Sequence, residues 1–364
     1  MGARVLLLGL LGPALSSCRT PPSDDGFGGT GGVEVSVGST SSSTGSSGAA
    51  PAVSTSSSSS TSGANSSTAA ELASDPVGTT SPPDLGVTGC AGKVDFLFVL
   101  SNQETMEPHA KQMQEAVPAF IETLETRFAE FDNHILVTDA NGVWGSAYCQ
   151  DCDGSCAHGP PEYPCLYPFE LEACDMVEGA GVTFPVGWGT QNKRCEVFGG
   201  NRYMIADDPT PHDTFTCLAS VGWDGGDNAP VEVMLKALRD DLNEPGGCNA
   251  GFLRDDALLV IVIVADTYEG TKGNPEDWRA ELLAHKGDDA NAVVLLAVTT
   301  DIDLEEHVCL PLKETNPNKN PMRALVELMT PQALIGGICE PSWAPFFEAA
   351  ADLVLEQCDV FAPG

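Results

Sequence analysis

Beyond residue 90 the chain contains long, nearly continuous hydrophobic runs. Three of them have the length of a strand and lie at Val94–Leu100, Ala257–Ala265 and Ala292–Val298. A weaker fourth run lies at His134–Thr138. Strands without polar alternation are buried on both faces, which favours a parallel sheet with helices covering each side.

Helical periodicity appears between these runs. The clearest stretch is Met106–Phe128, where apolar residues recur at three- and four-residue spacing and Thr105 is the expected N-cap. The alternation of strands and helices predicts an α/β fold: a doubly wound, mostly parallel sheet flanked by helices. The other expected helices are Val231–Leu242, Pro275–His285, Met322–Met329 and Ser342–Gln357.

The amino terminus has the pattern of an export signal over residues 1–17. Met1–Arg4 is a short basic start, and Val5–Leu15 is an apolar run too short to span a bilayer. The residues Leu-Ser-Ser-Cys that end at Cys18 resemble the bacterial lipobox, which implies cleavage before Cys18 and its acylation. Arg19 in place of Asp implies sorting to the outer membrane. The alternative is an ordinary secretory signal followed by a chance cysteine.

Residues 18–89 form the second segment. They are rich in Ser, Thr and Gly and contain few large apolar residues, so they cannot bury enough surface to offset the entropy of ordering. We expect an acylated cysteine and a disordered tether, with an r.m.s. span of roughly 45 Å. Residues 90–364 then form one large domain.

The chain is strongly acidic, with 52 Asp and Glu, 17 Lys and Arg, and a net charge of −35. Residues 1–89 hold six acidic and two basic residues, so 46 acidic and 15 basic residues remain and the domain carries a net charge of −31. Such a surface repels phosphates and anionic headgroups. We therefore expect no nucleic acid partner, and membrane contact only through the lipid anchor.

Catalytic motifs are absent from the sequence. It has no His-Glu-x-x-His, no Gly-x-Ser-x-Gly, no phosphate-binding loop and no dinucleotide fingerprint, and its six histidines are scattered. We expect no enzyme. The alternative is an extracytoplasmic hydrolase whose paired carboxylates meet only in the folded chain.

The thirteen cysteines fit an oxidising compartment, since setting Cys18 aside leaves an even twelve. A Cys-rich insertion is expected at about 141–216. It is either a rigid binding surface or a flap that packs its own aromatic residues. The first three insertion cysteines also have the spacing of a zinc knuckle, which remains the alternative to disulfides. The insertion holds Cys149, Cys152, Cys156, Cys165, Cys174 and Cys195, and the frame holds Cys90, Cys217, Cys248, Cys309, Cys339 and Cys358.

The first strand and the loop after it carry a family resemblance. The sequence KVDFLFVL-SNQETM at Lys93–Met106 resembles the opening of a von Willebrand factor type A (vWA) domain. The loop Val221–Asn228, then a helix, then the apolar strand before Asp266 continue the same order. The resemblance covers about residues 90–360. It implies a vWA-like fold and a protein-binding or adhesion function at the carboxyl ends of the strands.

The metal-binding residues of that family are only partly matched. The family holds a divalent cation with Asp-x-Ser-x-Ser after the first strand, a Thr from a second loop, and an Asp after the central strand. Ser101 and Gln103 replace the first Asp and the first Ser, and Trp223 falls near the Thr. We expect no cofactor. The alternative is a divalent cation such as Mg²⁺, held by the matching Thr105 and Asp266 with Glu104, Asp224 and Asp227 as further oxygen donors.

The resemblance also implies that the two ends of the domain lie close together, which pairs Cys90 with Cys358. With that pair set aside, Cys217 with Cys248 and Cys309 with Cys339 are the remaining frame pairs. The expected function is a metal-independent protein-binding or adhesion module, lipid-anchored in the cell envelope at the outer membrane. Its partner is a protein or cell-surface component that the sequence does not identify.

Overall fold

The computed structural model of the chain describes residues 89–140, 172–223, 225, 228–266, 270–310 and 320–363. Several features expected from the sequence lie outside these ranges. They are the signal segment, Cys18, the tether up to residue 88, Asp224, Asp227, Cys149, Cys152, Cys156 and Cys165.

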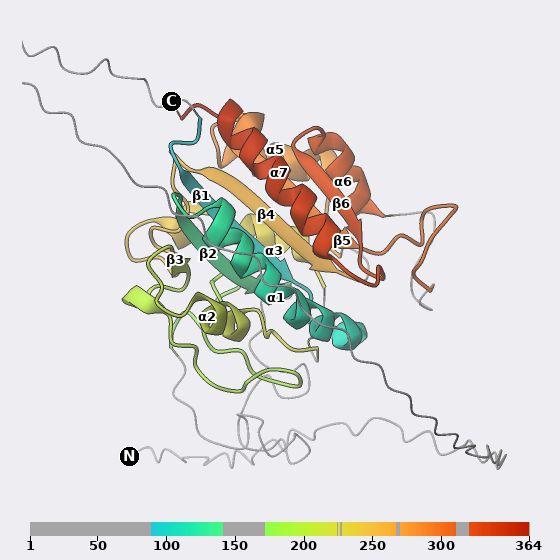
Figure 1. The fold of residues 1–364 in the computed structure, drawn as a ribbon, viewed down its shortest axis with the longest axis horizontal. Coiled ribbons are helices and arrows are strands. Elements are labelled where there is room, and N and C mark those ends of the chain that lie inside the picture. The colour runs from blue at the N-terminus through green and yellow to red at the C-terminus, as the bar shows by residue number, and fades with distance from the viewer. Residues whose placement is uncertain are drawn as a thin grey trace, which may run out of the picture. The chain divides into compact units, whose positions relative to one another are not determined.

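The described residues contain a six-stranded sheet in the order β3-β2-β1-β4-β5-β6 (Figure 1). Every neighbouring pair is parallel except β2 and β3, so the antiparallel strand lies at one edge. This order confirms the expected doubly wound, mostly parallel α/β fold. The strands are β1 (Lys93–Leu100), β2 (Asp132–Asp139), β3 (Met204–Ile205), β4 (Leu258–Ala265), β5 (Val293–Thr299) and β6 (Ala333–Gly337).

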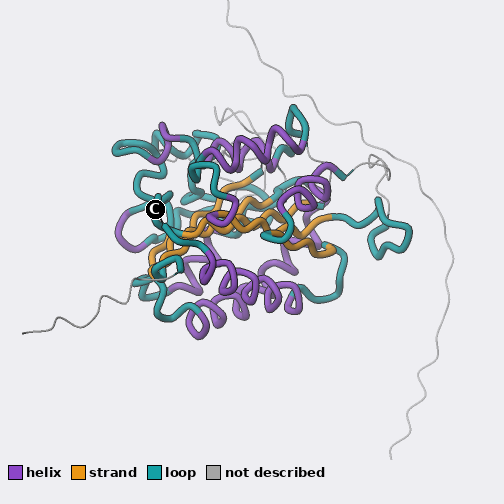
Figure 2. The backbone as a smooth tube through the Cα atoms, turned by 90° about the horizontal axis from the view of Figure 1, so that it is seen from above, coloured by secondary structure: helices purple, strands orange, loops and turns teal. Residues whose placement is uncertain are grey.

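Helices cover both faces of the sheet, as Figure 2 shows from above. The helices α1, α2 and α7 pack on one face, and α3, α5 and α6 pack on the other. No helix in the described ranges has both the length and the apolar character needed to cross a membrane. The helices are α1 (Glu107–Arg127), α2 (Pro211–Leu218), α3 (Pro230–Ala237), α4 (Asp240–Asn243), α5 (Pro275–Ala284), α6 (Pro321–Met329) and α7 (Ala344–Val360), with one-turn 3-10 helices at Glu104–Met106, Phe198–Gly200 and Ala290–Ala292.

The two helical layers explain the unbroken apolar runs. Successive residues of a strand point to opposite faces, so Phe96 and Phe98 pack under α1 while Leu97 and Val99 pack under the opposite layer. The ring of Phe98 meets that of Phe215 edge to face at 5.0 Å. A polar residue in the middle of such a strand would therefore be buried whichever face it pointed to.

Some elements begin or end where the sequence did not indicate. The expected helix Val231–Leu242 stops at Ala237, because the side-chain amide of Asn243 donates to the Ala237 carbonyl oxygen at 2.8 Å in place of a helical N–H. Thr105 is not an N-cap, since it lies in the 3-10 turn that precedes α1. The strands β3 and β6 and the helix α2 were not expected.

The expected Cys-rich insertion at about 141–216 is described only from residue 172 onward. Its described part contains β3 and most of α2, both of which belong to the α/β frame. The segment 172–203 is the loop-rich part, and it forms one short 3-10 turn at Phe198–Gly200. We call residues 172–203 the insertion segment.

Four disulfides lie among the described residues. The expected bridges Cys90–Cys358 and Cys309–Cys339 are present. The expected pairing of Cys217 with Cys248 is wrong, because each of them binds a cysteine of the insertion segment instead. These bridges are Cys174–Cys248 and Cys195–Cys217.

Candidate functional site

The carboxyl ends of β1, β4 and β5 lie at one edge of the sheet, which we call the site edge. The direction of winding changes between β1 and β4, and ligands of such sheets bind beyond that point. Two hydrogen bonds bring the loops together there. The N–H of Ser101 donates to the Val264 carbonyl oxygen at 2.8 Å, and the N–H of Gly225 donates to the Asn102 carbonyl oxygen at 2.7 Å.

Three buried oxygen atoms at the site edge have no hydrogen-bond partner within the described part of the chain. They are Ser101 Oγ, Asn102 Oδ1 and Asp266 Oδ1. Ser101 is 2% exposed, and Asn102 and Asp266 are each 5% exposed. Buried polar atoms are nearly always hydrogen-bonded, and an unmade bond costs about 1–3 kcal/mol. Three such atoms lie close together on adjacent loops of the site edge.

The Asp266 carboxyl is held in an unusual environment. Burial raises its pKa, while a hydrogen bond from the Thr105 hydroxyl and the nearby His109 imidazole lower it in part. His109 lies near the start of α1, and its Nδ1 is buried without a partner among the described groups. Burial is the largest of these effects. The surroundings therefore favour the protonated carboxyl, or a carboxylate whose charge is balanced by a positive group of a ligand.

The described residues do not fit a Mg²⁺ site. Mg²⁺ requires near-octahedral oxygen ligation, usually with more than one charged ligand from protein or substrate. Here Ser101 offers one hydroxyl, Asp266 offers one carboxylate oxygen, and the Thr105 hydroxyl is already bonded to that carboxyl. In the described ranges, no group of three His, Cys, Asp or Glu side chains can hold a metal ion. The orphaned oxygens therefore suit a hydrogen-bond donor better than a bare cation.

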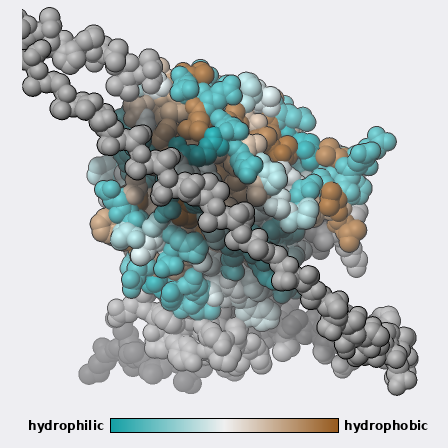
Figure 3. All heavy atoms as spheres, viewed as in Figure 1, coloured by the Kyte–Doolittle hydropathy of each residue, from teal (hydrophilic) through white to brown (hydrophobic). Residues whose placement is uncertain are grey.

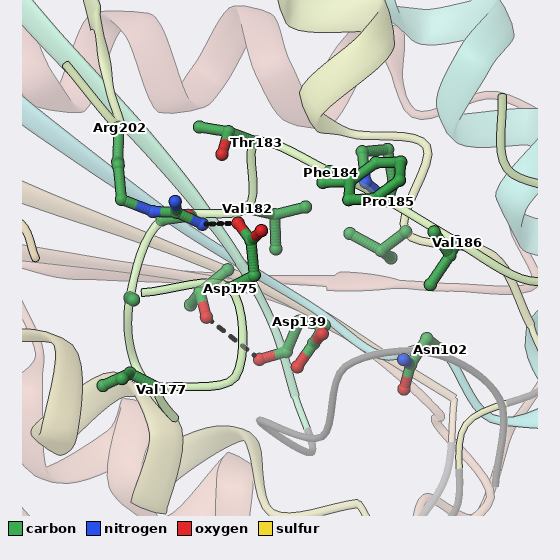
Figure 4. A pocket seen from close by; sticks show the side chains of 14 residues that line it. Asn102, Asp139, Asp175, Val177, Val182, Thr183, Phe184, Pro185, Val186 and Arg202 are labelled. Atoms are coloured by element: carbon green, nitrogen blue, oxygen red, sulfur yellow. Dashed lines mark hydrogen bonds and ion pairs between the residues drawn. The ribbon is translucent and has the colours of Figure 1, made fainter. Parts of the chain in front are cut away.

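A shallow polar cleft opens beside Asn102 (Figure 4), and its empty space is about 490 Å³ when the open solvent at its entrance is included. Its floor is formed by Asn102, Thr138 and Asp139, at the ends of β1 and β2. The insertion segment forms its wall, from Asp175 to Val186 and at Arg202. We call this hollow the polar cleft.

The wall of the polar cleft is fixed by an ion-pair group. Asp175 pairs with Arg194 at 2.7 Å and with Arg202 at 3.0 Å, and both arginines also pair with Glu172. Burial alone would raise the pKa of Asp175, but the hydrogen bonds from Arg194, the Glu172 backbone and Arg202 lower it. Arg202 Nε also donates to the Gly181 carbonyl oxygen at 2.7 Å. The wall is thus held in place by these ion pairs, and the two positive charges match the two negative ones.

A second, mostly apolar hollow is lined by Ser101, and its empty space is about 330 Å³ when the adjoining open solvent is included. Met106 and Met113 of α1 line it, together with Gly189 and Val221. Val221 lines the polar cleft as well. Two consecutive residues thus line different hollows: Asn102 lines the polar cleft and Ser101 lines the second hollow. Each has a buried side-chain oxygen without a hydrogen-bond partner among the described residues.

The rim of the second hollow depends on a glycine. Gly189 has a φ of +80°, and a Cβ added there would lie 1.9 Å from a ring atom of Trp223. Only glycine lets the Trp223 ring lie against this turn. The Trp223 N–H donates to the Trp188 carbonyl oxygen at 3.0 Å. The Trp188 side chain is 54% exposed.

The loop after β5 projects from the site edge, where it appears as the dark orange segment at the right of Figure 1. Asp301 accepts the N–H groups of Val308 at 2.7 Å and Cys309 at 2.9 Å, and the Cys309–Cys339 bridge closes the base. Leu310 is nonetheless 86% exposed. Brown atoms stand among teal ones on this projection in Figure 3. The loop therefore exposes the apolar side chains of Val308 and Leu310 on a backbone that is held by hydrogen bonds and a disulfide.

The structure gathers Ser101, Gln103, Thr105 and Asp266 at one place, as the sequence indicated. Asp224 and Asp227 lie outside the described residues. Sequence reasoning missed Asn102, because the family pattern treats that position as a spacer. Its place directly after β1 was the available signal.

No protein-family model and no curated protein matches this chain. Among solved structures, it is similar to proximal thread matrix protein 1 from the mussel byssus, with 11% identity, a TM-score of 0.37, and coverage of 73% of this chain and 49% of that one. The same mussel protein with a zinc-occupied MIDAS motif gives 11% identity, a TM-score of 0.36 and the same coverage. The pilus adhesin SpaC from Lactobacillus rhamnosus GG gives 10% identity and a TM-score of 0.35, over 73% of this chain and 30% of that one. This chain thus spans about half of the mussel protein and less than a third of the adhesin.

Proposed function

We propose that residues 90–364 form a vWA-like protein-binding or adhesion module that engages its partner at the site edge without a metal ion. The observation that carries this proposal is the set of three buried, unpartnered oxygens at Ser101, Asn102 and Asp266. A partner that donates hydrogen bonds to them removes the desolvation cost that the free domain bears. The free energy so recovered contributes to binding.

The surroundings of these oxygens support a protein as the partner. Trp188 and Leu310 are large, exposed and held by braced backbone at the same edge of the sheet. Aromatic and aliphatic anchors on rigid backbone are common centres of protein interfaces, because little side-chain entropy is lost when they bind. Polar depressions beside such anchors supply specificity.

We further propose that the module is attached to the outer membrane through acylated Cys18. The lipobox-like residues before Cys18 and the Ser/Thr/Gly-rich segment up to residue 89 support this assignment. A single acyl chain is a marginal anchor, so stable attachment requires several chains on the cysteine. The tether then gives the module reach from the membrane surface.

The test is capture of surface proteins by the purified full chain, with and without a chelator. Asp266→Asn keeps the side-chain volume and removes the charge, and Trp188→Ala removes a large side chain that is 54% exposed. Glu125→Gln, on the exposed face of α1, is the matched charge control. We expect a protein that wild type and the control capture equally in chelator and that both site variants lose.

Three results would contradict the proposal. Capture abolished by the chelator would assign a metal site, and capture unchanged in both site variants would place the interface elsewhere. Turnover of a substrate panel that is lost in Asp266→Asn would favour a hydrolase.

A further inference from the structure

We infer that the polar cleft receives a basic side chain, arginine or lysine, from the partner protein. The inference rests on the proposed function and names the chemistry of the partner. It is carried by the buried acceptor at Asn102, the charges around the cleft and the apolar part of its lining. Each is independent of the others.

The first observation is the acceptor itself. Asn102 lines the polar cleft and is 95% buried, yet its Oδ1 has no hydrogen-bond partner among the described groups. An amide oxygen accepts hydrogen bonds and cannot donate them. The missing group must therefore carry N–H or O–H donors, as guanidinium and ammonium groups do and a carboxylate does not.

The second observation is the charge around the acceptor. Arg194 and Arg202 balance Glu172 and Asp175 in the wall, so that group contributes no net charge. Asp139 adds a half-buried carboxylate to the floor. The domain as a whole carries a net charge of −31. An acidic side chain entering this cleft would be repelled by the net charge of the domain, whereas a basic one is attracted by it.

The third observation is the apolar part of the cleft lining. Val177, Pro185 and Val186 form it beside the polar floor. Arginine and lysine bury their methylene stems on such surfaces while the charged head reaches polar groups. The wall already holds one example of this chemistry, because the Arg194 guanidinium lies over the Phe184 ring at 4.9 Å.

The inference reverses the polarity expected from the family resemblance. In that pattern a bound cation accepts a carboxylate from the partner, and the charge of the metal makes an acidic partner favourable. Ser101 and Gln103 remove that arrangement in this chain, and the remaining acceptors are oxygens without a cation. A positive charge supplied by the partner takes the place of the metal charge.

The experiment measures binding of a short probe peptide to the full chain. The probe is acetyl-Gly-Arg-Gly-amide, and its control replaces arginine by citrulline, which keeps the shape and removes the charge. We expect the arginine peptide to bind about tenfold more tightly than the citrulline peptide, which corresponds to a difference of about 1.4 kcal/mol. Raised salt should narrow that difference.

Variants locate the binding. Asp139→Asn should weaken the arginine peptide several-fold, and Asn102→Leu should abolish its preference over citrulline. Asn102→Asp adds a charge at nearly the same volume and should strengthen arginine binding. A gain of affinity cannot arise from misfolding, so this variant keeps the test decisive even if Asn102→Leu is unstable. Glu125→Gln should behave as wild type.

The outcomes separate this inference from the proposed function. Equal affinities for the two peptides, or no gain in Asn102→Asp, overturn the inference even where wild type still captures a protein partner. The inference is supported if the full chain binds the arginine peptide more tightly than the citrulline peptide and loses this preference in the Asn102 and Asp139 variants. That result would support the inference even if the capture experiment failed and the proposed function were wrong. A captured partner should then lose binding when its own basic residue at the interface is changed to glutamine.

Discussion

Cys90 and Cys358 are joined twice. Their side chains form a disulfide with Cα atoms 4.8 Å apart, and the N–H of Cys90 donates to the carbonyl oxygen of Cys358 at 2.7 Å. Gly89 lies against the same carbonyl with a φ of +87°, where a Cβ would approach it to 2.6 Å. Cys90, which lies three residues before the start of β1, is thus attached to the last turn of α7.

Removing this bridge should destabilise the domain more than removing a shorter one. The Cys90–Cys358 bridge spans 268 residues and Cys309–Cys339 spans 30. The chain-entropy model gives stabilisation on the order of 5 and 4 kcal/mol respectively, both upper limits. Denaturant unfolding of Cys90→Ser/Cys358→Ser, with Cys309→Ser/Cys339→Ser as the control, measures the difference. Equal stability of wild type and the first variant would contradict this, as would peptide mapping that joins Cys90 to a different cysteine.

The full chain should respond weakly to Mg²⁺. Stabilisation by a ligand grows with its concentration relative to the dissociation constant, so an absent site leaves the melting temperature nearly unchanged in millimolar Mg²⁺. Ser101→Asp combined with Gln103→Ser moves the loop toward the family pattern and should increase the response. Adding Asp266→Ala to that pair should remove it again. A saturable rise in the melting temperature of wild type, lost in Asp266→Ala alone, would show that the native loop binds the ion.

Cys18 should be required for attachment to the membrane. Cys18→Ala removes the thiol that we propose is acylated, and we expect loss of fatty-acid labelling together with release or misprocessing of the protein. Ser17→Ala is the matched control, because it keeps a small residue before the cysteine. The measurement is membrane fractionation with labelled palmitate. Co-fractionation of Cys18→Ala with membranes at the wild-type level would rule out a lipoprotein.

Asp95 should make stability fall as the pH rises through weakly acidic values. It is fully buried in β1, and burial raises its pKa from 3.8 to about 6, although Arg254 opposes the rise through ion pairing and hydrogen bonds at 2.8 Å. Below pH 3.8 the folded and unfolded states both hold the proton, and the contribution of this carboxyl to stability is complete. Between these pKa values the folded state holds more protons than the unfolded state, so that contribution is lost as the pH rises through 6.

Asp95→Asn isolates this effect, because asparagine resembles the protonated acid. The free energy of unfolding of wild type minus that of the variant should fall by on the order of 3 kcal/mol between pH 4 and pH 7. Denaturant unfolding at several pH values measures it. Asp352→Asn, at an exposed carboxylate that pairs with Arg127, is the control for replacing a carboxylate by an amide. A difference that stays flat or rises for Asp95→Asn would contradict the assigned direction.

The sequence predicted the sheet where burial is strongest. The strands β1 and β4 are buried almost throughout, so their apolar runs are unbroken and their position is evident. The strand β6 was missed because Ala333–Gly337 is only half-buried and ends in two glycines. The strand β3 has two residues, too few for any period.

The site was predicted as far as it depends on strand ends. Ser101 and Asp266 follow β1 and β4, so parallel pairing brings them together. The polar cleft was not predictable, because its wall comes from the insertion segment, whose cysteines reach partners in the frame. Cys174 bonds Cys248 across 74 residues, and no local pattern distinguishes that partner from Cys217.

The fastening of Cys90 to Cys358 also determines how the domain carries mechanical load. The chain enters the domain at the amino end of β1, whereas the site edge lies at the carboxyl end of the same strand. Tension between a partner bound at the site edge and the amino-terminal attachment, both as proposed above, would therefore run along β1. This load acts on all the hydrogen bonds from β1 to β2 and β4 at the same time. They cannot break one after another from the amino end of β1, because Cys90 would first have to separate from α7. In single-molecule pulling, the oxidised domain should yield at a higher force than the reduced one.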